Sequence, residues 1–233
     1  FLGYYFSLVF AQWNLNNSEK ISCTLQDNFM RGKPDWLQNL NSIPKITIEK
    51  HDVLMPYQNF DYMNIIHAAS VASPIIYRKY PIETMDANVI GLRNLLDHQY
   101  KFKNQEKINT NFLFFSTSEI YGDPSHDQIP TSEDYNGNVS CTGPRACYDE
   151  SKRFGETLCV NFTKQRDLRT VIVRPFNNYG QGLKLDDGRV IPDFCSSALK
   201  NQKITMFSDG SPTRTFCYIS DALTGFLLAI THD

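Results

Sequence analysis

The chain has 233 residues, with 23 basic and 25 acidic side chains and a formal net charge of −2. This near-neutral balance excludes a broad electrostatic nucleic-acid binder, which needs clustered basic charge, so we expect no nucleic-acid partner. Hydrophobic residues make up 41% and charged residues 21%, as in an ordinary globular protein. No run approaches the roughly 18 apolar residues of a membrane helix, so we expect no membrane partner.

Strand-like and helix-like segments alternate along the chain. Short apolar or β-branched runs predict strands at 20–25, 45–48, 62–67, 111–116 and 168–173. Helical stretches are expected between them at 4–13, 82–99 and 146–166, and in the second of these apolar residues recur at three- and four-residue spacing. This alternation predicts an α/β fold with a doubly wound parallel sheet. Sheets of this kind bind ligands at the carboxyl ends of their strands.

The composition changes near Asn177. After it come Gly- and Asp-rich loops, such as GQGLKLDDGR, and short elements. We therefore expect one domain at 1–176. The segment 177–233 is then part of a second, smaller region, together with elements that return to the first domain.

The cysteines indicate the redox state of the compartment, and the spacing of the histidines indicates whether a metal site is expected. The six cysteines are scattered without a CxxC pair, which favours free thiols in a reducing compartment such as the cytoplasm. The five histidines show no ligand spacing, so we expect no metal site.

The strongest chemical signal is Tyr148 with Lys152, in the run YDESK. Residues four apart on a helix lie on one face. A phenol with a pKa near ~10 is a poor base at neutral pH, and a neighbouring ammonium favours its phenolate. The pair would take a proton from a substrate hydroxyl while a hydride leaves the same carbon. YxxxK alone is weak, and its position on a helix after the run NFLFFS strengthens it.

Three further features point to a ligand at the sheet edge. Hydroxyls follow the expected strand at 111–116 in the run STSEIYG, for which a polar strand-to-loop junction is the alternative. Gly3, just before a helix, is a candidate for the last glycine of a phosphate-binding turn. Asp27 ends the next strand, where an acid would bind a ribose diol, and a turn-forming Asp–Asn pair is the alternative.

These residues belong to a longer set of ordered matches. The chain resembles the extended short-chain dehydrogenase/reductases that act on nucleotide sugars (the NAD-dependent epimerase/dehydratase family), and within them the UDP-glucuronate decarboxylases. The resemblance covers nearly the whole chain. It rests on FLG (1–3), QDNF (26–29), HDV (51–53), HAASVASPIIY (67–77), TSEIYGDP (117–124), GPRACYDESKR (143–153), RPFNNYG (174–180), DDGRV (186–190) and RTFCYISD (214–221).

The resemblance implies a Rossmann-like NAD-binding domain at 1–176. Gly3 resembles the third glycine of a GxxGxxG turn, and Asp27 resembles the acid that accepts the adenosine ribose hydroxyls. Such a carboxylate favours NAD over NADP because it repels a 2′-phosphate. The other implied cofactor residues are Asp52 and Val53 beside the adenine, Ala68, Ala69 and Ser70 along the cofactor, and Tyr148 and Lys152 near the nicotinamide ribose.

The resemblance also implies the catalytic and substrate residues. Thr117 would hydrogen-bond the C4 oxygen of the sugar, Tyr148 would be the base, Lys152 would tune it, and Glu119 would lie near C5. The implied substrate residues are Tyr77, Ser118, Asn177, Arg189 and Arg214, the two arginines toward the nucleotide and diphosphate. Surface ion pairs are the alternative for the two arginines, and core packing is the alternative for Tyr77.

The implied reaction is conversion of UDP-glucuronate to UDP-xylose through a C4-keto intermediate. Related 4,6-dehydratases carry an Asp before the Glu, where this chain has Ser118, and 4-epimerases usually have neither acid, so Glu119 disfavours that reaction. Epimerization or dehydration of another nucleotide sugar remains an alternative. A non-catalytic nucleotide-binding protein is the alternative of another class, and we would expect it to have lost Tyr148 or Lys152.

Two more expectations come from the resemblance. Relatives dimerise through the helix that holds YxxxK and its neighbour, which implies a homodimer. If Gly3 closes the phosphate turn, the first strand and two glycines are absent, so we expect roughly ten residues before Phe1. The chain also stops short of the relatives' substrate-domain tail, so we expect truncation at both ends.

Overall fold

The computed structural model describes residues 1–57, 60–185, 188–206 and 208–232. Within this part of the chain, the strands pair in parallel in three groups. One pair consists of β1 (Cys23–Asp27) and β2 (Ile46–Lys50). The central group consists of β3 (Asn64–His67), β4 (Asn111–Phe115) and β5 (Arg169–Val173), in that order. The last pair consists of β6 (Asn177–Tyr179) and β7 (Phe216–Tyr218).

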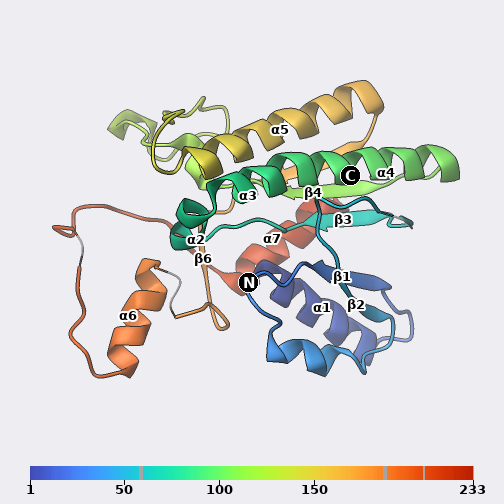
Figure 1. The fold of residues 1–233 in the computed structure, drawn as a ribbon, viewed down its shortest axis with the longest axis horizontal. Coiled ribbons are helices and arrows are strands. Elements are labelled where there is room, and N and C mark those ends of the chain that lie inside the picture. The colour runs from blue at the N-terminus through green and yellow to red at the C-terminus, as the bar shows by residue number, and fades with distance from the viewer. Residues whose placement is uncertain (58–59, 186–187, 207, 233) are drawn as a thin grey trace.

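Helices connect these strands (Figure 1). They are α1 (Leu2–Asn16), α2 (Pro74–Lys79), α3 (Pro81–Asp86), α4 (Leu92–Glu106), α5 (Ala146–Arg166), α6 (Val190–Leu199) and α7 (Ile219–Thr231). A π-helical turn, Ala87–Gly91, joins α3 to α4. Short 3₁₀ turns lie at Asp35–Leu40, Ser118–Tyr121 and His126–Gln128.

Strand β4 shows why the sheet is covered on both faces. Its side chains alternate between two apolar cores, because successive residues of a strand point to opposite faces. Phe112 and Phe114 pack with residues of α4 and α5, whereas Leu113 and Phe115 pack with residues of α1 and α7. Figure 1 shows the same layers, with α4 and α5 on one side of β3 and β4 and α7 on the other. The predicted doubly wound α/β fold is therefore confirmed.

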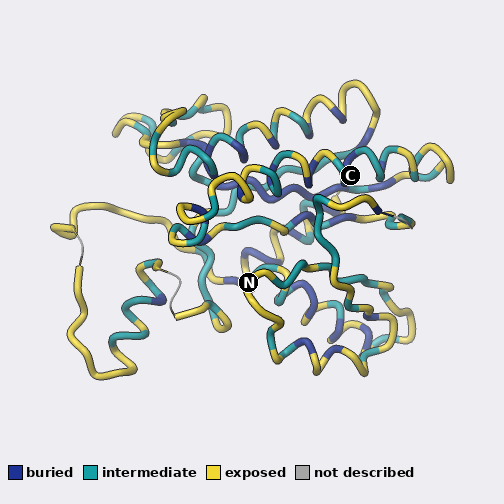
Figure 2. The backbone as a smooth tube through the Cα atoms, viewed as in Figure 1, coloured by how far each residue is buried: buried dark blue, intermediate teal, exposed yellow. Residues whose placement is uncertain are grey.

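The burial pattern follows these layers (Figure 2). Phe112, Leu113 and Phe114 are fully buried, and so are Leu92 and Leu96 on the inner side of α4. A third core, between α1 and β2, contains Ala11, Leu37, Leu40 and Ile46. Residues 198–206 and 208–216 are by contrast exposed throughout.

The predicted elements agree with the structure except at one helix. All five predicted strands are present, with bounds shifted by up to three residues, and helices occupy the other two predicted ranges. The predicted helix at 82–99 is instead α3, the π turn and α4. The extra residue of the π turn places Gly91 against Val53, whose Cγ2 lies 2.5 Å from the position a Cβ on Gly91 would take. A side chain there would collide with Val53.

Helix α7 belongs to the central core although it lies late in the chain. Leu223 and Phe226 pack with Phe115 of β4, and the rings of Phe115 and Phe226 meet edge to face at 4.8 Å. This helix is an element that returns to the sheet. The boundary at residue 176 stays a prediction. Among the described helices, none is both long and apolar enough to cross a membrane.

Candidate active site

The loop after β4 carries the first part of the site. Thr117 lies two residues after the end of the strand, is buried, and accepts a hydrogen bond from the Glu119 backbone N–H at 3.3 Å. The next residue, Ser118, donates its backbone N–H to the carbonyl of Pro175 at 3.0 Å, beyond the end of β5. These two bonds fix the loop at the carboxyl edge of neighbouring parallel strands, where such sheets bind their ligands.

Helix α5 presents Tyr148 and Lys152 to that edge. Both side chains are buried, at 8% and 2% exposure. The Lys152 Nζ donates to the carbonyl of Phe115 at 2.7 Å and lies 5.9 Å from the centre of the Tyr148 ring. The phenol of Tyr148 is hydrogen-bonded to the side chain of Thr117. The structure thus brings together three of the residues singled out for catalysis.

Burial dominates the ionisation of this pair. It raises the pKa of Tyr148 to about 12, against the lowering effect of the Thr117 hydrogen bond. Burial also lowers the pKa of Lys152 to about 7. We expected the Lys152 ammonium to lower the pKa of Tyr148, and the net direction is the opposite. The reason is that desolvation disfavours both charged forms and that Lys152 donates to a backbone carbonyl instead of the phenol.

Tyr77 of α2 forms one wall of the site. Its side chain is only 1% exposed, and its ring stacks on that of Tyr148 with centres 5.2 Å apart and planes 8° from parallel. Tyr77 therefore contacts the proposed base directly and is also packed in the core. The core packing considered for it is thus present, and its role toward a substrate stays a prediction.

Two carboxylates and an arginine surround the phenol. The Arg145 guanidinium forms an ion pair with the Glu119 carboxylate, and its Nε lies 3.9 Å from the Asp149 Oδ2. Burial raises the pKa of Asp149 to about 6, while the charge of Arg145 lowers it. Burial lowers the pKa of Arg145 and the Glu119 charge raises it, with a net upward shift.

The predicted adenosine-side residues lie after β1 and β2. Asp27 ends β1 and accepts the backbone N–H of Phe29 at 2.6 Å, so it does form the turn considered as its alternative. Asp52 accepts from the Asn28 amide and from the Leu54 N–H, both at 3.0 Å, and these bonds lower its pKa. The amide of Asn28 therefore links the ends of the two strands.

The remaining predicted residues fall into two groups. Gly3 lies in the first turn of α1, and Val53, Ala68, Ala69 and Ser70 follow β2 and β3. Asn177 begins β6 and its amide donates to the Thr215 carbonyl at 3.0 Å. Arg189 caps the start of α6, and Arg214 is exposed with its guanidinium on the Thr213 carbonyl. No described contact brings these last three to Tyr148, and Figure 1 shows α6 away from the central sheet.

Comparison with known proteins identifies the family of this chain. A family model described as "NAD dependent epimerase/dehydratase family" matches residues 20–233. The chain belongs to the NAD-dependent epimerase/dehydratase family. This membership confirms the resemblance found in the sequence motifs.

Curated relatives of this family member are named UDP-glucuronic acid decarboxylases. UDP-glucuronic acid decarboxylase 5 of Arabidopsis thaliana is 37% identical over 94% of this chain and 62% of the relative. UDP-glucuronic acid decarboxylase 1 of Danio rerio is 38% identical over 88% of this chain and 47% of the relative. The chain spans less than two thirds of the length of either relative.

Solved structures share the fold. A UDP-N-acetylglucosamine 4-epimerase from Methanobrevibacter ruminantium superposes with a TM-score of 0.79 at 24% identity, over 100% of this chain and 70% of that one. A UDP-glucuronic acid 4-epimerase from Bacillus cereus, in complex with UDP-glucuronic acid and NAD, superposes with a TM-score of 0.77 at 25% identity, over 97% and 69%.

The family implies NAD, and the described residues fit such a cofactor. The hydroxyls of Ser70 and Ser116 are buried without a hydrogen-bond partner among the described residues. They lie beyond the carboxyl ends of β3 and β4, at the edge that also carries Thr117. Buried polar groups are rarely left unpaired in proteins, so these two hydroxyls indicate the place of a polar ligand.

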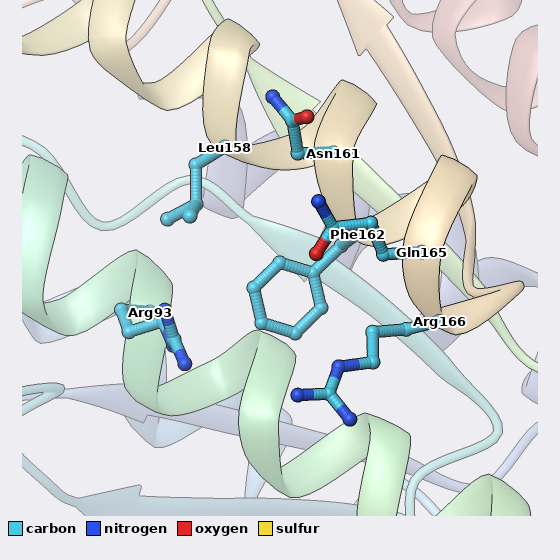
Figure 3. Close-up of a pocket in the computed structure, with 6 residues that line it drawn as sticks. All are labelled: Arg93, Leu158, Asn161, Phe162, Gln165 and Arg166. Atoms are coloured by element: carbon cyan, nitrogen blue, oxygen red, sulfur yellow. The ribbon is translucent and has the colours of Figure 1, made fainter.

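A hollow between α4 and α5 is separate from this edge (Figure 3). It holds about 110 Å³ and is lined by Arg93, Leu158, Asn161, Phe162, Gln165 and Arg166. Arg93 is paired with Asp97 at 2.6 Å and lies over the Phe162 ring. None of its lining residues is among the predicted site residues.

The sequence motifs gave no individual role to Arg145 or Asp149. A signal for both was available in the run RACYD, because Arg and Asp four apart on a helix lie on one face beside Tyr148. The hydroxyl of Ser116 belongs to the run STSEIYG, whose hydroxyls were expected at the sheet edge, but its lack of a hydrogen-bond partner among the described residues depends on how the strands are packed.

Proposed function

We propose that this chain carries NAD-dependent chemistry on a nucleotide sugar, and that the reaction is decarboxylation of UDP-glucuronate to UDP-xylose. The observation that carries the proposal is the meeting of Thr117, Tyr148 and Lys152 at the carboxyl edge of the sheet, with Glu119 beside them. Relatives named UDP-glucuronic acid decarboxylase, matched over most of the chain, support the choice of substrate.

Tyr148 takes the proton of the sugar's C4 hydroxyl in this proposal. The hydrogen bond from Thr117 lowers the pKa of the phenol and so offsets part of the rise that burial causes. Thr117 also orients the C4 oxygen, and Lys152 binds the nicotinamide ribose. NAD, when bound, supplies an acceptor and donor of hydride, which interconverts the C4 alcohol and ketone.

The sugar's own chemistry then explains the loss of CO2. A carboxylate on C5 is β to a ketone at C4, so the carbonyl accepts the electron pair of the breaking C–C bond. No leaving hydroxide has to be protonated, and Ser118 in place of a second acid suits this step. Glu119 lies near C5, where it handles the proton that replaces the carboxylate.

The binding residues that no described contact tests are part of the same proposal. Gly3, Asp27, Asp52 and Val53 serve the adenosine half of NAD, with Ala68, Ala69 and Ser70 along the cofactor. Tyr77, Ser118, Asn177, Arg189 and Arg214 serve the nucleotide sugar. The two guanidinium groups among them, of which that of Arg214 is exposed, suit a diphosphate, which a guanidinium binds in a bidentate way.

A nucleotide-sugar 4-epimerase is the second candidate. The Bacillus cereus UDP-glucuronic acid 4-epimerase shares the fold and was solved with UDP-glucuronic acid and NAD. The UDP-glucuronic acid in that complex carries the same carboxylate, so the substrate alone does not distinguish the two reactions. The product does, because an epimerase keeps the C6 carboxylate and a decarboxylase releases it.

The test is incubation of the full-length protein with UDP-glucuronate and NAD⁺, followed by measurement of CO2 and of the product sugar by NMR. We expect CO2 and UDP-xylose in equal amounts, with no net NADH. UDP-galacturonate without CO2 would overturn decarboxylation in favour of epimerization. Tyr148→Phe is the matched control, since it removes only the phenol oxygen.

We also propose a homodimer and a cytoplasmic location. Exposed apolar side chains on α3, α5 and the π turn, including Met85, Ile90, Phe154 and Val160, support a helical interface. Six free thiols support a reducing compartment. Light scattering of Phe154→Glu tests the interface, and an unchanged dimer mass would contradict it.

A further inference from the structure

Arg145 stands at the junction of the two elements that carry the site. It is the residue before α5 and lies three positions ahead of Tyr148. Its guanidinium pairs with Glu119, in the turn after β4, and its Nε lies 3.9 Å from Asp149, the first neighbour of Tyr148 on α5. One planar side chain therefore spans from the strand-end loop to the helix.

The Arg145 guanidinium also acts on Tyr77, whose ring forms one wall of the site. Its charge lowers the pKa of Tyr77, against the raising effect of burial. Tyr77 in turn stacks on Tyr148 at 5.2 Å. Three side chains around the phenol, from three different elements, thus share Arg145 as a neighbour.

The charge balance shows what Arg145 does there. Asp149 is only 8% exposed, and burial together with the charges of Glu119 and Glu150 raises its pKa. Arg145 is the cation that opposes these effects on Asp149. An opposite charge beside a carboxylate favours its ionised form, so Arg145 favours the ionised form of Asp149.

A second arginine on the same helix provides the contrast. Arg153 donates to the backbone carbonyls of Ile120 and Asn136, at 3.0 and 2.8 Å, and so ties the loop to α5. Its Nε also lies 3.8 Å from the Glu150 carboxylate, and none of these contacts is with Glu119, Asp149 or Tyr77. The partners of Arg145 are instead the acidic and aromatic side chains that face the reacting hydroxyl.

We infer that Arg145 is a positioning residue for the proposed reaction, which holds the Glu119 and Asp149 carboxylates in place around Tyr148. The inference rests on the proposed function, since Glu119 acts at C5 only if the substrate carries a reacting group there. Arg145 itself need not touch the sugar. Its guanidinium fork contacts two acids at once, which an ammonium does less well.

Loss of the Arg145 charge should shift the pH dependence of the rate in a defined direction. The charged groups that act on Asp149 are Arg145, Glu119 and Glu150, and the phenols of Tyr148 and, from α2, Tyr77 interact with both carboxylates. Removing Arg145 leaves the raising effects on Asp149 unopposed. The pKa of that carboxyl, now about 6, therefore rises, and a rate that needs it ionised falls off at a higher pH.

The test compares Arg145→Gln, Arg145→Lys and Arg153→Gln in the full-length protein. For each variant we would measure the folded fraction by circular dichroism, kcat and KM from pH 5.5 to 9, and the Asp149 titration by 13C NMR. Selective labelling of aspartate, with Asp149→Asn for assignment, identifies the signal. The NMR arm needs no turnover, so it remains informative whichever reaction the protein catalyses.

We expect Arg145→Gln to lower kcat at least tenfold with little change in KM, to move the acid limb of the profile upward, and to raise the Asp149 pKa. Arg145→Lys should restore part of kcat. Arg153→Gln should lower the folded fraction without moving the profile. An unchanged Asp149 titration, or a loss of activity only in proportion to folded protein, would overturn the inference. Absence of CO2 with an intact shift in titration would overturn the decarboxylation instead.

Discussion

The sheet edge around Tyr148 and the outlying segment 177–216 are built in opposite ways. At the edge, the side chains of Tyr77, Thr117, Tyr148 and Lys152 are at most 8% exposed. In the outlying segment, residues 198–206 and 208–216 are all exposed. Figure 2 shows the contrast as a dark centre and a light periphery.

The proposed catalytic residues thus lie in the buried part of the molecule, and the arginines proposed to bind the nucleotide lie in or beside the exposed part. Catalytic groups need fixed geometry, so they lie on strand ends and on a helix that is packed against the core. The residues proposed to bind the nucleotide, Arg189 and Arg214, lie on segments with few buried contacts, and such segments move at low free-energy cost. A substitution should therefore affect turnover or folding at the edge, and mainly substrate affinity in the segment.

Tyr148→Phe is the sharpest way to break that comparison. Loss of a positioned general base lowers turnover by about 10²- to 10⁴-fold, while NAD affinity should stay within a factor of about two or three. Steady-state assays and cofactor titration by fluorescence measure the two quantities. Tyr100→Phe, on α4, is the control and should keep wild-type turnover. Turnover retained in Tyr148→Phe would show that the base is another group.

Gly155→Ala should damage the packing behind the site. A Cβ at this position would lie 2.4 Å from Cζ of Phe114 and 3.2 Å from Cδ2 of Leu92. Forcing extra volume into a packed core costs roughly 1–3 kcal/mol of unfolding free energy. Gly225→Ala is the matched control on α7, where a Cβ meets nothing within 4 Å, and it should stabilise by about 0.5–1 kcal/mol. Urea unfolding measures both, and equal effects would contradict this packing.

Lys152→Met should change how stability depends on pH. The folded pKa of Lys152 is lowered to about 7, below the value of 10.5 in an unfolded chain. Between these values the unfolded chain binds the extra proton, so the contribution of Lys152 to stability rises with pH. The variant lacks this group, so its gain in Tm over wild type should be larger at pH 6.5 than at pH 9.

The pH range is chosen to isolate this lysine. His67 is also buried, with its pKa lowered to about 3 from 6.5, so its own contribution changes below pH 6.5. The Cys159 thiol, with its pKa raised to about 12 from 9.0, affects stability only above pH 9. A Tm difference that is constant from pH 6.5 to 9 would show that Lys152 stays charged in the fold.

Arg214→Gln tests the exposed side of the comparison and should have the smallest effect. Its side chain is exposed, so the free energy of unfolding should change by less than about 0.5 kcal/mol. Loss of a charged hydrogen bond to a diphosphate should raise KM roughly tenfold, with kcat little changed. Lys203→Gln, in the same exposed segment, should leave KM unaltered. An unchanged KM for Arg214→Gln would place the diphosphate elsewhere.

Local patterns carried most of the fold and part of the site. The apolar run NFLFFS predicted β4, and YxxxK after it predicted the meeting of Tyr148 with the strand end. Both depend on spacing along one element, which a sequence displays directly. The ion pair of Arg145 with Glu119 joins residues 26 positions apart, and only the folded chain shows it.

The ionisation of the site was the part that sequence reasoning missed. A Lys four residues after a Tyr predicts a lowered phenol pKa only if both groups stay solvated enough to be charged and the ammonium lies beside the phenol oxygen. In the structure, burial raises the pKa of Tyr148, and Lys152 donates to the Phe115 carbonyl. Desolvation depends on every neighbour at once, and spacing along a helix does not encode it.

The π turn at Ala87–Gly91 sets the rotational register of α4, that is, which of its side chains face the core. Each residue of an α-helix advances the direction of the side chains by about 100°. Deleting one residue from this turn would rotate Leu92, Leu95 and Leu96 together, away from Phe112 and Phe114 and toward solvent. It would also separate Asn88 from its 2.9 Å hydrogen bond to Ser151, beside Tyr148. Single-residue insertions and deletions should therefore be rejected here far more strongly than in the loops near α6.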